Sequence, residues 1–209
     1  MLFKSFSEKI NTTLGRLSPA RRIFLSFALV IFAGSLLLSL PFVQATSSQA
    51  TYFDHLFTAV SMVCVTGLFT QPVATTYNIW GQLICMFLIQ IGGLGLMTFI
   101  GVFYIQSKQK LSLRSRETIL ESFSYGETQS LMVFIRSIFL TTFIVEGLGA
   151  FLLSFRFVPE FGWGRGIFTS IFVAISAFCN AGFDNFGSTS LVAFQTDPLI
   201  NLVIAGLII

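Results

Sequence analysis

One motif occurs twice in this chain and restricts the folds that the chain can adopt. Residues 53–67 read FDHLFTAVSMVCVTG, and residues 168–182 read FTSIFVAISAFCNAG. The identical pairs are Phe53/Phe168, Phe57/Phe172, Ala59/Ala174, Ser61/Ser176, Cys64/Cys179 and Gly67/Gly182. Each copy is an apolar stretch that is too short to cross a bilayer and that ends at a glycine. A short helix that dips into the membrane and stops at a glycine turn is what an ion-selectivity filter requires, and such filters are rings of repeated segments.

The composition indicates a protein that is embedded in a membrane. Hydrophobic residues make up 54% of the chain and charged residues only 10%, whereas soluble proteins average roughly 25% charged residues. The 26 phenylalanines suit a surface that faces lipid. Because a helix satisfies its own backbone hydrogen bonds in lipid, we expect an all-α integral protein of the cell (plasma) membrane.

The basic residues are concentrated in two segments, and this predicts the orientation of the chain. Five of the twelve Lys and Arg residues lie within residues 1–22, and four more lie within 108–116. The stretch between Arg22 and Lys108 contains neither residue type. The positive-inside rule therefore places both segments, and with them the N-terminus, in the cytoplasm. Because the second cluster directly follows an apolar segment, we do not expect it to bind nucleic acid.

Apolar and polar segments alternate along the chain and predict two repeats of one unit. We expect a cytoplasmic basic arm at 1–22, a first span–pore-loop–span repeat at 23–106, a cytoplasmic linker at 107–130 and a second repeat at 131–209. The expected spans are 23–43, 79–105 and 131–158, and the expected dips are 53–65 and 166–180. A cleaved signal peptide is the alternative for 23–43, but a signal core has only about 7–15 apolar residues.

The number of crossings predicts how the repeats are related. Each unit crosses the membrane twice, so both dips enter from outside, as in parallel repeats around a central pore rather than in the inverted repeats of many carriers. The last apolar segment, 198–209, would reach only about 18 Å, against a hydrocarbon core of about 30 Å. We therefore expect the second repeat to be truncated in its second span. Two dips supply half of a fourfold ring, which further sequence or another chain would complete.

The residues after each dip are the candidate ion-binding site. A dip of about a dozen helical residues ends near the middle of the bilayer, and its C-terminal end carries about half a negative charge. The next residues can present carbonyls that replace the hydration shell of a cation: Val65, Thr66, Gly67 and Leu68 in the first copy, and Asn180, Ala181, Gly182 and Phe183 in the second. Without an acidic ring, such a site suits a monovalent ion. A glycine that only ends a helix would explain one copy, but two matching copies disfavour that interpretation.

Several segments resemble a known transporter family. FTAVSMVCVTGL, followed by IWGQLICMFLIQIGGLGLMTF, is similar to the first repeat of the K⁺-translocating subunits of the Ktr/Trk/HKT superfamily, and FVAISAFCNAGFDNFG is similar to the second. The resemblance covers essentially residues 20–209, and the KtrB type is the nearer match. It implies four K⁺-channel-like repeats, of which this sequence is the N-terminal half, with K⁺ as the transported ion and Gly67 and Gly182 in the filter. It also implies a homodimer and a cytoplasmic, nucleotide-binding regulatory partner of the KtrA type.

Some other unusual residues have structural interpretations. The IGGLG segment at 91–95 lies inside an apolar span with no preceding strand, so close helix packing explains it better than dinucleotide binding; a flexible point below the filter is the alternative. Arg136 lies near the cytoplasmic end of its span and can extend to the interface. Glu146 is deeper and is expected to face protein or water, with sequence after Ile209 as one source of its partner.

The sequence also leads to expectations for one histidine, for two serines and for the three cysteines. His55, at the start of the first dip, is expected to be an interfacial residue rather than a pH sensor. Replacing Ser61 or Ser176 with Ala is expected to affect selectivity less than replacing the filter glycines. The three cysteines lack CxxC spacing and are expected to act as small hydrophobic residues rather than in a disulfide or metal site.

The sequence as a whole predicts a pore subunit for K⁺ uptake. K⁺, with Na⁺ as a further candidate ion, would move passively through a filter lined by carbonyl groups. No Ser/His/Asp, Cys/His or paired-carboxylate pattern is visible, so we expect neither an enzyme nor a cofactor. The alternative is a non-conducting membrane scaffold with re-entrant helices, but a scaffold gives no reason to repeat the helix-to-glycine pattern.

Overall fold

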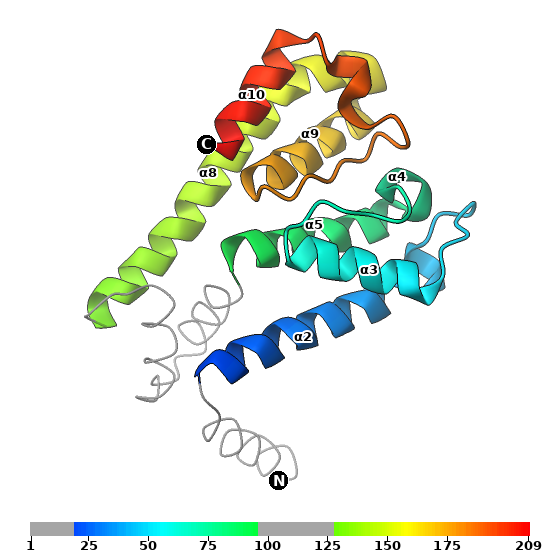
Figure 1. The fold of residues 1–209 in the computed structure, drawn as a ribbon. Helices are drawn as coiled ribbons and strands as arrows, with labels where there is room; N and C mark the ends of the chain where they lie inside the picture. The colour runs from blue at the N-terminus through cyan, green and yellow to red at the C-terminus, as the bar shows by residue number, and fades with distance from the viewer. Residues whose placement is uncertain (1–18, 96–127) are drawn as a thin grey trace. The chain divides into compact units, whose positions relative to one another are not determined.

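The computed structural model describes residues 19–95 and 128–209, and their regular structure is helical apart from one isolated antiparallel bridge between Gln44 and Tyr77. The longer helices, labelled in Figure 1, are α2 (Pro19–Leu38), α3 (Tyr52–Val63), α5 (Ile79–Leu94), α8 (Thr128–Phe161), α9 (Trp163–Phe178) and α10 (Pro198–Ile208). The short ones are η1 (Pro41–Val43), α4 (Val73–Thr76) and η2 (Ser190–Phe194). The basic cluster at 108–116 and most of the expected linker lie outside the described residues.

The contacts divide the chain into two units. The first consists of Met1–Leu29 and Leu96–Ser137, of which the structure describes the first parts of α2 and α8. The second consists of Val30–Gly95 and Ile138–Ile209 and contains both copies of the repeated motif. The contacts described below lie within the second unit.

One helical stretch among the described residues, Arg136–Phe161 within α8, is long and apolar enough to cross a membrane. It overlaps the span expected at 131–158. The stretches Phe24–Leu38, Ile79–Leu94 and Pro198–Ile208 are apolar but shorter. For the span expected at 79–105, the structure describes only the part up to residue 95.

Both expected dips are helical, with boundaries a few residues from the expected ones. The first is α3 and the second is α9, which begins three residues before position 166. The earlier start has a local cause: Gly162 has a φ of +79°, a conformation that favours glycine, and it turns the chain directly after α8. Both helices end two residues before a residue in the left-handed region, Val65 or Asn180.

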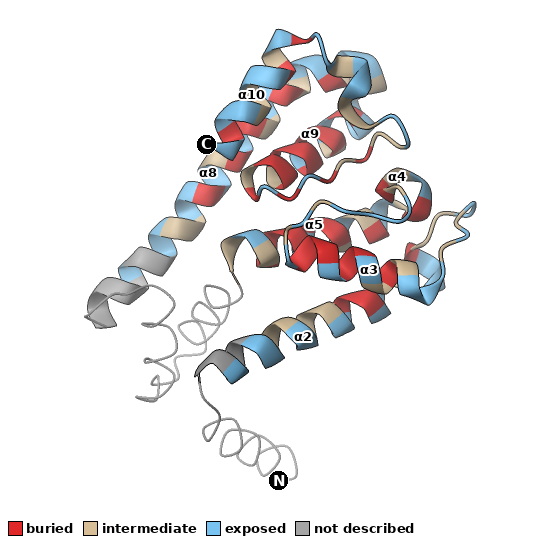
Figure 2. Cartoon of the chain, viewed as in Figure 1, coloured by how far each residue is buried: buried red, intermediate tan, exposed pale blue. Residues whose placement is uncertain are grey.

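Helix α5 packs against both dip helices, and two glycines permit the close approach. A Cβ atom on Gly92 would lie 2.6 Å from the carbonyl oxygen of Val63, at the end of α3. A Cβ atom on Gly93 would lie 2.4 Å from the Sγ atom of Cys179, just after α9. These distances confirm close packing as the reason for the first two glycines of IGGLG. Buried residues are accordingly frequent along α3, α5 and α9 (Figure 2).

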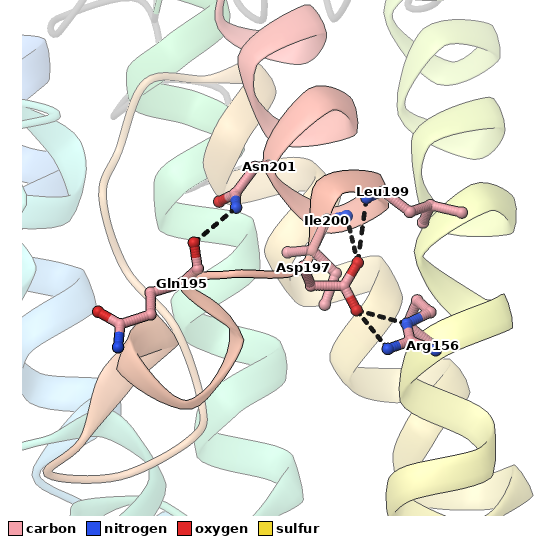
Figure 3. Close-up of polar contacts among 6 residues, drawn as sticks. All are labelled: Arg156, Gln195, Asp197, Leu199, Ile200 and Asn201. Carbon is pink, nitrogen blue, oxygen red and sulfur yellow. Dashed lines mark hydrogen bonds and ion pairs between the residues drawn. The ribbon is translucent and has the colours of Figure 1, made fainter.

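Helices α8 and α10 are joined by an ion pair that the sequence patterns did not indicate (Figure 3). The carboxylate of Asp197 accepts hydrogen bonds from the N–H groups of Leu199 (3.0 Å) and Ile200 (3.2 Å) and so caps the start of α10. Its other oxygen accepts from Nε of Arg156, on α8, at 2.5 Å. Asp197 is therefore both a helix cap and a link between two helices. Next to this link, the buried ring of Phe157 belongs to the hydrophobic core shared by α8, α9 and α10.

Candidate functional site

The two copies of the repeated motif have the same backbone conformation where the dip helices end. Val65 and Asn180 both have φ of 56°, and Gly67 and Gly182 have φ of 72° and 70°. A β-branched residue such as Val65 is rarely found at positive φ, because its Cβ substituents crowd the backbone. Strained backbone of this kind is concentrated at functional sites. The same unusual turn therefore occurs in both copies, at the positions that the repeated motif predicted.

In the first copy, one serine organises the turn. The N–H group of Thr66 donates to the backbone oxygen of Ser61 at 2.9 Å. The N–H group of Leu68 donates to the hydroxyl oxygen of the same serine, also at 2.9 Å. Ser61 is 2% exposed, so both bonds are shielded from bulk solvent at the serine.

The second copy repeats this arrangement with Ser176. The N–H group of Ala181 donates to the backbone oxygen of Ser176 at 2.7 Å, and the N–H group of Phe183 donates to its hydroxyl oxygen at 2.8 Å. Ser176 is also 2% exposed. Sequence reasoning missed both hydroxyl contacts, although the presence of serine at the same place in both copies was a signal for them.

These bonds determine where the next carbonyl groups point. In a trans peptide, the C=O and N–H groups lie on opposite sides. The carbonyl groups of Val65 and Gly67 therefore point away from Ser61, and those of Asn180 and Gly182 point away from Ser176. Within residues 19–95 and 128–209, no group donates a hydrogen bond to these four oxygen atoms. Free carbonyl oxygens aimed away from the supporting helix have the chemistry of a cation-binding surface.

The turns of the two copies lie against each other. A Cβ atom on Gly67 would lie 3.0 Å from the carbonyl oxygen of Ala181, and one on Gly182 would lie 3.4 Å from Cα of Gly67. Beyond the glycines, the rings of Phe69 and Phe183 are 6.3 Å apart between centroids. The structure therefore brings together two segments that are more than one hundred residues apart in sequence.

A carboxylate ties the chain after the first turn back to the start of its helix. Asp54, in the first turn of α3, accepts hydrogen bonds from the hydroxyl of Thr70 at 2.7 Å and from the N–H group of Thr51 at 2.8 Å. The bond from Thr70, and then those from Thr51, lower the pKa of Asp54 to about 2. In the second copy Asn185 takes the place of Thr70, and its side chain donates instead to Oε1 of Gln82 on α5 at 3.2 Å.

Two residues differ from the sequence-based expectations. His55 was expected to be an interfacial residue rather than a pH sensor, but its side chain is buried within the protein: it is 1% exposed, and its Nδ1 atom lies 2.9 Å from the hydroxyl of Tyr77. The cause is tertiary, because the bridge between Gln44 and Tyr77 brings the tyrosine over the start of α3. Glu146 has its partner within the described residues: Nε2 of Gln90 donates to its Oε1 at 2.8 Å, and both side chains are buried.

The described residues contain no group of three or more His, Cys, Asp or Glu side chains that would hold a metal ion. The three cysteines are free, and Cys85 and Cys179 are buried, as small apolar side chains often are. Cys64, in contrast, is exposed at the end of α3.

Comparison with known proteins places this chain in a family. The profile of the TrkH family, described as a cation transport protein, matches residues 22–209. The chain is 42% identical over 194 residues to the potassium/sodium uptake protein NtpJ of Enterococcus hirae, a match that covers 93% of this chain and 43% of that protein. It is 38% identical to the Ktr system potassium uptake protein B of Bacillus subtilis, over 93% of this chain and 43% of that protein. It is also 38% identical to the protein of the same name from Vibrio alginolyticus, over 90% of this chain and 41% of that protein. The chain thus spans less than half the length of these relatives.

Proposed function

The chain belongs to the TrkH family of cation transport proteins, which are membrane transporters and not enzymes. On that premise we propose that it conducts K⁺ through a carbonyl-lined filter, with Na⁺ as a further candidate ion. The filter residues in this proposal are Val65, Thr66, Gly67 and Leu68, with Asn180, Ala181, Gly182 and Phe183. The names of the relatives, which describe potassium or potassium/sodium uptake, support the choice of ion.

The observation that carries this proposal is the pair of matching turns. Gly67 and Gly182 adopt the same positive φ, and the peptide group that follows each is held so that its carbonyl oxygen points away from the helix. The two turns touch, as neighbouring segments of a ring would. The C-terminal ends of α3 and α9 add partial negative charge behind these oxygens, which favours a cation.

We propose the span–pore-loop–span organisation as the membrane arrangement. In it, α3 and α9 are re-entrant helices of two parallel repeats, at 23–106 and 131–209, and the two dips form half of a fourfold ring. The arm at 1–22 and the linker at 107–130 are cytoplasmic. Single cysteines at Ser47 and Ser112 test this orientation: an impermeant reagent applied to intact cells should label the first and not the second, and the opposite pattern would refute it.

The partners belong to the same proposal. The name of the Bacillus subtilis relative refers to a Ktr system, which implies further subunits. We propose that the complete protein forms a homodimer and binds a cytoplasmic nucleotide-binding subunit of the KtrA type. Copurification with that subunit, and a dimer mass in detergent, are the expected results. A monomer that retains uptake without any partner would contradict both.

The filter assignment is tested by changing its glycines in the complete open reading frame. A side chain at Gly67 or Gly182 is opposed by the left-handed backbone, at a cost of roughly 1–2 kcal/mol, and at Gly67 it also meets the carbonyl oxygen of Ala181. Gly67→Ser and Gly182→Ser should each weaken the discrimination of K⁺ over Na⁺. The measurement is ⁸⁶Rb⁺ uptake in competition with Na⁺, normalised to the amount of inserted protein.

A matched control is available on α8. Gly147→Ser introduces the same side chain where its Cβ would meet nothing within 4 Å beyond the adjoining backbone of α8, and φ is not positive. It should leave selectivity unchanged. The non-conducting scaffold remains the alternative function, and it predicts no K⁺ uptake by the wild-type protein and no difference between the filter variants and this control.

A further inference from the structure

We propose that Ser61 and Ser176 are positioning residues of the filter, whose hydroxyl groups hold the carbonyl groups of Gly67 and Gly182 toward the ion. This inference rests on the proposed function, because it assigns these serines to the same filter. It assigns the serines a role in the filter that the sequence-based expectation, in which they matter less than the glycines, did not include.

The first argument is that each serine makes two contacts with the turn that follows it. Its backbone oxygen accepts a hydrogen bond from the residue five positions later, and its hydroxyl oxygen accepts one from the residue seven positions later. The two hydroxyl bonds, at 2.9 Å and 2.8 Å, have the same geometry in both copies. A backbone oxygen is present in any residue, whereas the second contact requires a side-chain acceptor of this length.

The second argument concerns the glycine that lies between these contacts. The N–H group held by Ser61 belongs to the peptide that joins Gly67 to Leu68, so the hydroxyl bond determines the direction of the Gly67 carbonyl. Glycine has little intrinsic preference between positive and negative φ. Without the hydroxyl, this peptide plane would be free to rotate, and its carbonyl oxygen would no longer be aimed in one direction. The same reasoning applies to Ser176 and Gly182.

The two copies differ in what would replace the lost hydroxyl. The hydrogen bond from the N–H group of Leu68 is only partly buried, whereas the bond from Phe183 is buried. The hydroxyl of Ser61 also lies 2.7 Å from the hydroxyl of Thr66, a group that Ala181 lacks in the second copy. Loss of the hydroxyl is therefore less easily compensated at Ser176, and we expect the larger effect there.

The experiment uses the complete open reading frame in an uptake-deficient strain. Ser176→Ala should lower the K⁺ over Na⁺ ratio of ⁸⁶Rb⁺ uptake by about fivefold, the factor that corresponds to the net contribution of one hydrogen bond. Ser61→Ala should lower it by a smaller factor. Ser176→Thr, which keeps a hydroxyl, should retain more of the ratio than Ser176→Ala does.

Ser170 provides the matched control within the same helix. It is 1% exposed, and its hydroxyl donates to the backbone oxygen of Gly166 rather than to the filter. Ser170→Ala should leave the ratio unchanged even if it lowers the amount of inserted protein. If Ser176→Ala is not inserted, Ser176→Cys, of similar size but with a weak acceptor, takes its place and should also lose selectivity.

The possible outcomes separate this inference from the proposed function. If Gly182→Ser loses selectivity while both serine variants keep the wild-type ratio, the positioning role is wrong and the filter assignment stands. If the glycine and serine variants all keep the wild-type ratio, the filter assignment itself fails. Equal losses in Ser176→Ala and Ser170→Ala would indicate a general packing effect and would also overturn the positioning role.

Discussion

The close packing at Gly92 offers a stringent test of how α5 supports the proposed filter. A Cβ atom at this position would lie 2.6 Å from the carbonyl oxygen of Val63 and 2.8 Å from that of Met62. Both are backbone atoms at the end of α3, so neither can move away as the end of a flexible side chain would. Gly92→Ala must therefore displace α5 from α3 or shift the turn after α3, where we propose the first filter segment.

The expected change in the free energy of unfolding of Gly92→Ala follows from two opposing terms. Overpacking of a tightly packed interior costs roughly 1–3 kcal/mol. Replacing glycine with alanine within a helix stabilises the helix by about 1 kcal/mol or less. Because the obstacle at Gly92 is backbone, we expect a net loss of about 1–2 kcal/mol. Gly147→Ala on α8 meets nothing within 4 Å and should show only the gain.

Thermal unfolding of the purified protein in detergent measures the difference. With roughly 2–4 °C per kcal/mol for a chain of this size, the Tm of Gly92→Ala should lie roughly 2–12 °C below that of Gly147→Ala. Gly92→Ala should also weaken discrimination between K⁺ and Na⁺ if the proposed filter is correct, since the shift occurs next to it. An equal or higher Tm for Gly92→Ala would refute the reasoning, because the contact would then be tolerated without cost.

Two further predictions concern buried and half-buried polar pairs. Gln90→Leu leaves the carboxyl group of Glu146 without its 2.8 Å partner and should lower the free energy of unfolding by about 1–3 kcal/mol. Gln90→Leu combined with Glu146→Leu should recover part of that loss in a double-mutant cycle of Tm values. A double variant less stable than Gln90→Leu would contradict this. Asp197→Ala should lower the Tm more than Arg156→Ala does, because Asp197 caps α10 and also pairs with the half-exposed Arg156. A larger fall in Tm for Arg156→Ala would mean that the cap contributes little to stability.

Several features of this protein are readable from local sequence. The repeated pattern located both dip helices to within about three residues, because each ends where the chain must enter a left-handed turn. The glycines at 67 and 182 were identified for the same reason, since positive φ is a local requirement that few residues meet. The class of protein followed from composition, and the match to a cation transport family agrees with it.

Other features depend on contacts between segments that are distant in the chain. The IGGLG pattern indicated close packing, but only the structure shows that Gly92 meets the end of α3 and Gly93 meets Cys179 after α9. Likewise, His55 is buried because Tyr77 folds over it. No periodicity within one helix contains this information, because the partner lies on another element.

The sequence by itself thus determined which segments are apolar, where helices α3 and α9 end and which residues form the two turns. These properties depend on hydrophobicity and on backbone conformations that each residue favours locally. The tertiary structure decided which groups face one another: Gln90 with Glu146, and the turn of Gly67 with the turn of Gly182. It also decided the aim of the carbonyl oxygens, because that direction depends on whether each turn folds back onto the serine hydroxyl of its own helix.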